Sequence, residues 1–114
     1  MRVASATRTL APAAAILIVT AAAVGAAPPP AAATHTVVIE NLQFSPRELT
    51  VNRGDRIVWV NKDLFPHTAT TEGKGFDSHS IAANASWSYV ASRPGTYPYG
   101  CTFHPTMKAT LTVK

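Results

Sequence analysis

The sequence predicts an all-β domain, a Greek-key β-sandwich, after an N-terminal signal segment. Two observations lead to this prediction. From residue 36 onward, short runs of β-branched and aromatic residues alternate with turn residues at regular intervals, which is typical of a sandwich. No stretch in this part shows the apolar periodicity of an amphipathic helix. With 114 residues, the chain has room for one such domain.

Residues 1–27 have the layout of a secretory signal peptide. Arg2 and Arg8 give a positively charged start, an apolar run extends from Leu10 to Val24, and small residues follow it. The apolar run is shorter than the ~20 residues that a membrane span needs. We therefore expect cleavage, export to the periplasm or another extracytoplasmic compartment, and no membrane span in the mature form. An uncleaved N-terminal anchor is the alternative.

The folded domain is expected over residues 36–114, after a flexible linker rich in Pro and Ala at residues 28–35. Strands are expected where β-forming residues are bounded by turn signals. In chain order, these strands are residues 37–44, 49–51, 56–61, 86–90, 96–101 and 109–113. Turn signals separate them at Ser45-Pro46, Asn52-Arg53-Gly54-Asp55, Lys62 to Pro66 and Ser92-Arg93-Pro94-Gly95. The aromatic residues are expected in the core, namely Trp59, Trp87, Tyr97 and Tyr99.

Charge and cysteine content exclude some classes of function. The formal net charge of the chain is +4, and two of its ten basic residues are in the expected signal peptide. This charge is too mild for a nucleic-acid binder, and no basic run is present. The single cysteine allows no internal disulfide. A lone thiol in a small exported domain suggests metal binding, with an inert buried thiol as the alternative.

One stretch near the C-terminus concentrates metal-donor side chains. Cys101, His104 and Met107 follow one another at Cys-x-x-His-x-x-Met spacing. Tyr97, Tyr99 and Cys101 occupy alternate positions, so they share one face of the expected strand and Cys101 points inward. A tight loop after the cysteine would bring the imidazole and the thioether toward the same point.

A metal needs at least one further donor, and the candidates are His35, His67 and His79. His67 follows the expected strand 56–61, so it meets the donor loop if strands 56–61 and 96–101 end at the same pole of the sandwich. His79 is expected to be a solvated loop histidine, and His35 is expected in the flexible start. Two imidazoles, a thiolate and a thioether are the donor set of a blue-copper site. Zinc accepts two imidazoles and a thiolate as well.

Taken together, the motifs resemble those of the cupredoxins, and among them the amicyanins, pseudoazurins and plastocyanins. The resemblance extends over about residues 37–113. It rests on Phe44-x-Pro46, Gly54-Asp55, Val58-Trp59-Val60-Asn61, Pro66-His67, Pro94-Gly95-Thr96-Tyr97-x-Tyr99-x-Cys101 and His104-x-x-Met107. The two-residue gap between His104 and Met107 is similar to the short loop of amicyanins.

The resemblance implies a function as well as a fold. By it, His67, Cys101, His104 and Met107 bind one type 1 copper ion, and the protein shuttles single electrons outside the cytoplasm without being an enzyme. Copper storage or delivery is the alternative function. Redox protein partners are expected to dock at an apolar patch around His104, and the protein is expected to be a monomer. Lys62 and Lys108 are expected near the rim of this patch.

Two positions depart from the pattern of the family. Thr68 stands where the family usually has an asparagine that ties the two ligand loops together, and its shorter hydroxyl leaves this tie open. Phe103 stands where amicyanins tend to have proline. It keeps a backbone N–H that is expected to donate to the thiolate sulfur.

Overall fold

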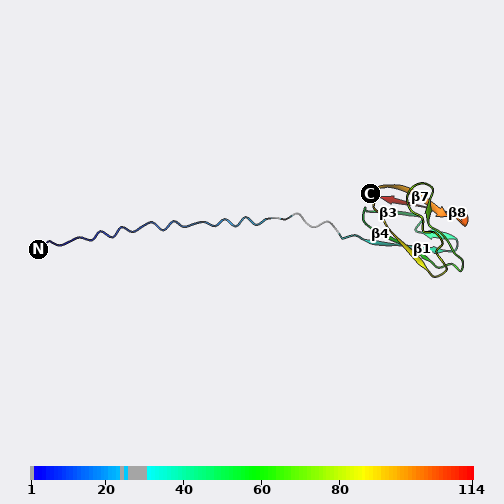
Figure 1. Ribbon diagram of the computed structural model, residues 1–114, viewed down its shortest axis with the longest axis horizontal. Helices are drawn as coiled ribbons and strands as arrows, with labels where there is room; N and C mark the ends of the chain where they lie inside the picture. The colour runs from blue at the N-terminus through cyan, green and yellow to red at the C-terminus, as the bar shows by residue number, and fades with distance from the viewer. Residues whose placement is uncertain (1, 24, 26–30) are drawn as a thin grey trace.

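The computed structural model describes residues 2–23, 25 and 31–114. Residues 2–23 form neither helix nor strand and extend away from the folded part (Figure 1). Residues 1, 24 and 26–30 lie outside the described residues, and they include parts of the expected signal peptide and linker. In the described part of the chain, no helix has the length and apolar character needed to cross a membrane.

The folded part is a sandwich of two four-stranded sheets, which confirms the predicted all-β class. The first sheet has the order β2-β1-β4-β6 and the second the order β3-β8-β7-β5. The pairs β1/β4 and β3/β8 are parallel, so both sheets are mixed. The strands are β1 (Thr34–Glu40), β2 (Gln43–Ser45), β3 (Glu48–Val51), β4 (Arg56–Asn61), β5 (Thr70–Thr71), β6 (Ser86–Val90), β7 (Gly95–Cys101) and β8 (His104–Val113).

The core lies between the two sheets and is built from alternate residues of the strands. On β4, for example, Ile57 and Trp59 are fully buried, whereas Val58 between them and Val60 after them are partly exposed. Burying one large aliphatic or aromatic side chain contributes roughly 1.5–3 kcal/mol. Other buried apolar side chains come from both sheets, namely Val37, Ile39, Phe44, Val51, Tyr99, Leu111 and Val113.

The first strand begins earlier than expected and is followed by a hairpin. β1 starts at Thr34 and includes His35, which we had expected in the flexible linker. The reason is Asp55, whose carboxylate accepts hydrogen bonds from Ala33 N–H and from His35 Nε2, both at 2.9 Å. The expected strand 37–44 is divided by a turn at residues 41 and 42, which have positive φ angles of 54° and 58°.

The donor stretch forms the tip of a tight β-hairpin. β8 begins at His104 and not near residue 109, so only Thr102 and Phe103 separate it from β7. The register shifts at the end of β7, because Gly100 pairs with Lys108 whereas Cys101 pairs with His104. A Cβ atom on Gly100 would lie 2.6 Å from the carbonyl oxygen of Met107, so only glycine allows this close approach.

Candidate metal centre

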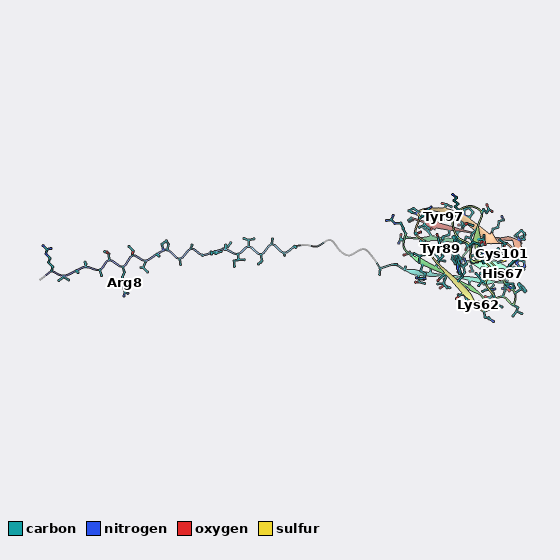
Figure 2. The ribbon with its side chains drawn as sticks, viewed as in Figure 1. Arg8, Lys62, His67, Tyr89, Tyr97 and Cys101 are labelled. Carbon is teal, nitrogen blue, oxygen red and sulfur yellow. The ribbon has the colours of Figure 1, made fainter. Side chains whose placement is uncertain are left out.

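Three of the predicted ligands converge at one end of the sandwich. Cys101 ends β7, His104 begins β8, and His67 lies in the connection between β4 and β5 (Figure 2 labels Cys101 and His67). The Sγ atom of Cys101 lies 3.6 Å from Nδ1 of His67 and 3.7 Å from Nδ1 of His104. The donor atoms of all three residues lie within 4.8 Å of one another.

These distances fit a shared metal ion. With metal–sulfur bonds of about 2.3 Å and metal–nitrogen bonds of about 2.0 Å, ligand angles between tetrahedral and trigonal separate N and S by about 3.5–3.8 Å. The two observed separations fall in this range. Cys101 and His67 are buried and His104 is half-buried, so one imidazole edge reaches the surface. The donors thus form a largely dry site with one opening.

His67 is held rigidly by its backbone. Its N–H donates to the carbonyl of Ile81 at 3.1 Å, and its carbonyl accepts from Ile81 N–H at 2.7 Å. The buried side chain of Asn61 donates to the carbonyls of Phe65 and Ile81, both at 2.9 Å. Asn61 therefore fixes the turn before His67 and the segment beside it. We expected Asn61 only as a strand end, because nothing in the sequence shows which carbonyls it reaches.

Asp63 fixes the imidazole ring of His67. Its Oδ2 lies 2.7 Å from Nε2 of His67, so Nε2–H donates to the carboxylate and Nδ1 faces the sulfur. Burial opposes ionisation of Asp63, but hydrogen bonds from Leu42 N–H, His67 and Asn41 N–H together hold its pKa below the usual value. Asp63 was not expected at the site from the sequence. The available signal was an acidic residue four positions before a candidate ligand, in the same turn.

Thr68 ties the two ligand segments together. Its Oγ1 accepts a hydrogen bond from Thr102 N–H at 2.9 Å and lies 3.2 Å from the hydroxyl of Thr102. Its own N–H donates to Cys101 Sγ at 3.3 Å. The hydroxyl of Thr68 therefore reaches the Thr102 segment, although it is shorter than the asparagine side chain that is usual in the family. Among the described residues, the backbone N–H group that donates to the sulfur is that of Thr68. A hydrogen bond from Phe103 N–H to the sulfur stays a prediction.

Met107 is buried on β8, with 2 % of its surface exposed. It lines a hollow together with Cys101, Thr102 and Pro105. The other two histidines lie apart from the centre. His35 is bonded to Asp55, and His79 is exposed beside Asp77.

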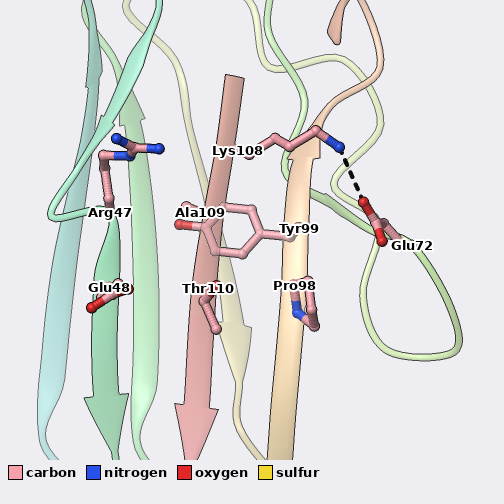
Figure 3. A pocket seen from close by; sticks show the side chains of 8 residues that line it. All are labelled: Arg47, Glu48, Glu72, Pro98, Tyr99, Lys108, Ala109 and Thr110. Carbon is pink, nitrogen blue, oxygen red and sulfur yellow. Dashed lines mark hydrogen bonds and ion pairs between the residues drawn. The ribbon is translucent and has the colours of Figure 1, made fainter. Parts of the chain in front are cut away.

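A larger hollow of about 530 Å³ lies away from the donors, over β7 and β8 (Figure 3). There Lys108 Nζ forms an ion pair with Glu72 at 3.2 Å. Lys108, which we had expected near the rim of the surface around His104, does not line the hollow at His104, but it lines the hollow beside Cys101 and Pro105. Four residues besides His104 line the hollow at that surface, namely Leu42, Phe65, Pro66 and Phe103.

Comparison with known proteins supports the assignment of this site. A family model described as a cupredoxin-like domain matches residues 12–113. The chain belongs to the cupredoxin-like family. Amicyanin-alpha of Methylorubrum extorquens is 29% identical over 83 residues, which cover 68% of this chain and 70% of the relative. Amicyanin of Paracoccus versutus is also 29% identical, and there the match spans 63% of the relative, a little under two thirds.

Further likenesses extend to plastocyanins and to solved structures. Plastocyanin of Scenedesmus fuscus is 31% identical, over 64% of this chain and 88% of that protein. A reduced amicyanin variant is similar in structure, with a TM-score of 0.67, 27% identity, and coverage of 71% of this chain and 82% of the other. A copper-containing nitrite reductase from Thermus scotoductus has the same TM-score at 26% identity, but the match covers only 22% of its chain.

The family and the donor set agree on the cofactor. A thiolate suits Cu(I), and imidazole suits both oxidation states of copper. The cofactor of this cupredoxin is therefore copper, with His67, Cys101 and His104 as the candidate ligand set.

Proposed function

We propose that this cupredoxin is a type 1 copper electron carrier that shuttles single electrons outside the cytoplasm. The observation that carries the proposal is the convergence of one buried thiolate and two imidazoles, one of which opens to an apolar surface. When bound, copper supplies a one-electron couple between Cu(II) and Cu(I). The chain holds the donors, excludes water from them and offers a partner one exposed imidazole edge.

The ligand set that we propose is His67, Cys101, His104 and Met107. Three of these side chains have converging donor atoms. Met107, which is buried and lines a hollow with Cys101, would supply a weak thioether donor. The hydrogen bonds of Asp63 and Thr68 hold His67 and Cys101 before any metal binds. Little has to move when the oxidation state changes, which favours fast electron transfer.

The surface around His104 is the proposed docking patch for redox protein partners. We define this docking patch as Leu42, Phe65, Pro66, Phe103 and His104, which line a hollow of about 280 Å³. Phe65 is 46 % exposed and Phe103 is 52 % exposed, although both are large apolar side chains. Weak redox encounters use small interfaces, and an apolar patch of this kind permits close but brief contact.

The likeness to a copper nitrite reductase raises the question of enzyme activity. That enzyme is much longer than this chain, since the match covers 22% of it. Among the described residues, one group of converging His, Cys, Asp or Glu donors is present. The similarity to amicyanins and plastocyanins supports an electron carrier rather than an enzyme.

Spectroscopy and electron exchange test the function. The protein with one equivalent of Cu(II) should be intensely coloured through sulfur-to-copper charge transfer, and Cys101→Ser should abolish the colour. Phe103→Glu should slow electron self-exchange while the spectrum stays nearly unchanged. Thr50→Glu is the matched control, because it adds the same charge on an exposed position of β3. Slow exchange in the wild type with ready release of copper to a chelator would favour storage or delivery.

Export is part of the same proposal. The basic start, the apolar run and the small residues before Pro28 support a cleaved signal peptide. Mass spectrometry of the exported protein should find a new N-terminus between Ala26 and Thr34. A mature protein that retains residues 1–20 would favour an N-terminal anchor.

A further inference from the structure

Oxidisable aromatic side chains form a continuous series through the sandwich. We call Tyr99, Trp59, Trp87 and Tyr89, in this order, the aromatic ladder. The ring centroids of Tyr99 and Trp59 are 5.7 Å apart, and Trp59 Nε1–H donates to the hydroxyl of Tyr99 at 3.2 Å. Trp59 and Trp87 are separated by 5.4 Å, and Trp87 stacks on Tyr89 at 6.0 Å with an interplanar angle of 15°. Each ring therefore contacts the next.

The ladder leads from the metal centre to the surface. Tyr99 lies two residues before Cys101 on the same face of β7, and it is 3 % exposed. Trp59 is completely buried, whereas Trp87 and Tyr89 are half-buried. Figure 2 shows Tyr89 and Tyr97 together, at a distance from Cys101 and His67. The four positions carry indole and phenol groups, which lose single electrons far more readily than the side chains of Phe or Leu.

Phe76 joins a second tyrosine to the ladder. Its ring centroid lies 4.9 Å from that of Tyr89, 6.5 Å from that of Tyr97 and 5.2 Å from that of Trp59. Phe76 itself resists oxidation, so it fills the space between the oxidisable rings without carrying the radical. The surface end of the series is therefore a pair of tyrosines, Tyr89 and Tyr97.

Positive charge surrounds this tyrosine pair. Tyr89 and Tyr97 line a hollow of about 360 Å³ together with Lys74 and Arg93. Among the residues that the structure describes, neither of these two cations forms an ion pair. Small anions should therefore be attracted to this hollow, and salt should weaken the attraction.

We propose that the aromatic ladder carries electrons from the reduced metal centre to radicals formed at Tyr89 and Tyr97, so that the protein quenches anionic one-electron oxidants. The carbonate radical anion is the representative of this class. The proposal rests on the copper function above, because the metal centre is the source of the electron. Its direction is downhill, since phenoxyl and indolyl radicals are strong oxidants and Cu(I) on a thiolate is a mild reductant.

The proposed reaction conserves electrons and protons. The carbonate radical anion takes one electron and the phenol proton from Tyr89, which gives bicarbonate and a neutral tyrosyl radical. One electron then passes from Cu(I) along Tyr99, Trp59 and Trp87 to this radical, which takes up one proton from water and becomes tyrosine again. In total, one carbonate radical anion, one Cu(I) ion and one proton are converted into one bicarbonate ion and one Cu(II) ion. Tyr99 is buried, and its hydroxyl accepts the indole N–H of Trp59, so it lies as a bridge between the metal centre and Trp59.

Pulse radiolysis tests the ladder. Carbonate radicals are generated in solutions of the Cu(I) protein and of the same protein loaded with Zn(II), and the tyrosyl absorption is followed. In the Cu(I) protein we expect a fast decay whose rate does not depend on protein concentration, matched by the rise of the Cu(II) colour. The Zn(II) protein should lack this phase. Raising the salt concentration should slow radical formation but leave the later decay unchanged.

Two variants of one residue show whether the route runs through Trp87. Trp87→Phe keeps a ring in place but removes an oxidisable group, so the fast phase should be lost. Trp87→Tyr restores an oxidisable ring and should restore the phase. Equal tyrosyl lifetimes in the Cu(I) and Zn(II) forms of a protein that is blue with Cu(II) would overturn the ladder alone. A colourless Cu(II) protein would overturn the copper function and the ladder with it.

Discussion

The carboxylate of Asp63 holds the imidazole of His67 from the side opposite to Cys101, with 2.7 Å between Oδ2 and Nε2. A negative charge therefore lies one ring away from the proposed metal. Such a partner orients the ligand, raises its basicity and favours the more positive oxidation state.

Asp63→Asn should weaken copper binding and raise the reduction potential. The amide loses the negative charge that favours Cu(II), and metal affinity should fall by about 10–100-fold, as is usual for such partners. Competition titration and voltammetry measure the two effects. Asp77→Asn is the control, because Asp77 also accepts several hydrogen bonds but pairs with His79 instead. Equal changes in both variants would mean that Asp63 has no special effect on the ligand.

Thr68→Val should loosen the link between the ligand segments. Valine keeps the shape of the side chain but leaves Thr102 N–H without its acceptor, which should cost about 1 kcal/mol in the free energy of unfolding. Urea unfolding of the metal-free protein measures this cost. Thr50→Val, at an exposed position of β3, should change little. Identical unfolding midpoints for the two variants would show that the Thr68 hydroxyl does not link the segments.

Gly100→Ala should displace Met107. The added Cβ would lie 2.6 Å from the carbonyl oxygen of Met107, so the β7/β8 hairpin must shift at a cost of about 1–3 kcal/mol. The shift should also change the copper spectrum, because Cys101 is the next residue. In Gly73→Ala the new Cβ meets nothing within 4 Å, so this variant is the control. An unaltered spectrum and stability in Gly100→Ala would contradict the close approach.

Because of Asp55, the stability of the metal-free protein should change with pH in the acid range. Its hydrogen bond with His35, together with those from Ala33 and Asn52 N–H, lowers its pKa from the ordinary value of 3.8. The ionised carboxylate therefore stabilises the fold fully above 3.8, and this contribution is lost as the pH falls through the lower folded-state pKa. Asp55→Asn should be less stable than the wild type at neutral pH, and the difference should shrink in this acid range. Urea midpoints that differ by the same amount at every pH would refute this.

The general fold and the convergence of His67, Cys101 and His104 could be predicted because each left a local pattern. Alternation along residues 96–101 gave the inward direction of Cys101, and the turn signals marked most strand ends. The boundaries at β1 and β8 could not be predicted in this way. They depend on partners far apart in the sequence, such as Asp55 for His35 and β7 for the first residues of β8.

The supporting hydrogen bonds of the site were harder to predict for the same reason. Asn61, Asp63 and Thr68 act on atoms that only the folded chain brings near. From the family resemblance, it was open whether the short side chain of Thr68 can link the two ligand segments. The length of a side chain does not reveal how closely the Thr68 and Thr102 segments approach each other. The separation between those segments is a property of the whole sandwich.

The turn at Asn41 and Leu42 has a consequence for the partner surface. Leucine residues rarely adopt a positive φ angle, but Leu42 does so in this turn. Its N–H donates to Asp63 Oδ2, the same oxygen atom that accepts a hydrogen bond from His67. Leu42 also lines the docking patch. One oxygen atom is therefore shared between a residue of the proposed docking patch and a proposed metal ligand. A partner that displaced Leu42 on docking would change the hydrogen bonding of His67 through this atom, and the proposed docking would then be linked to the reduction potential of copper.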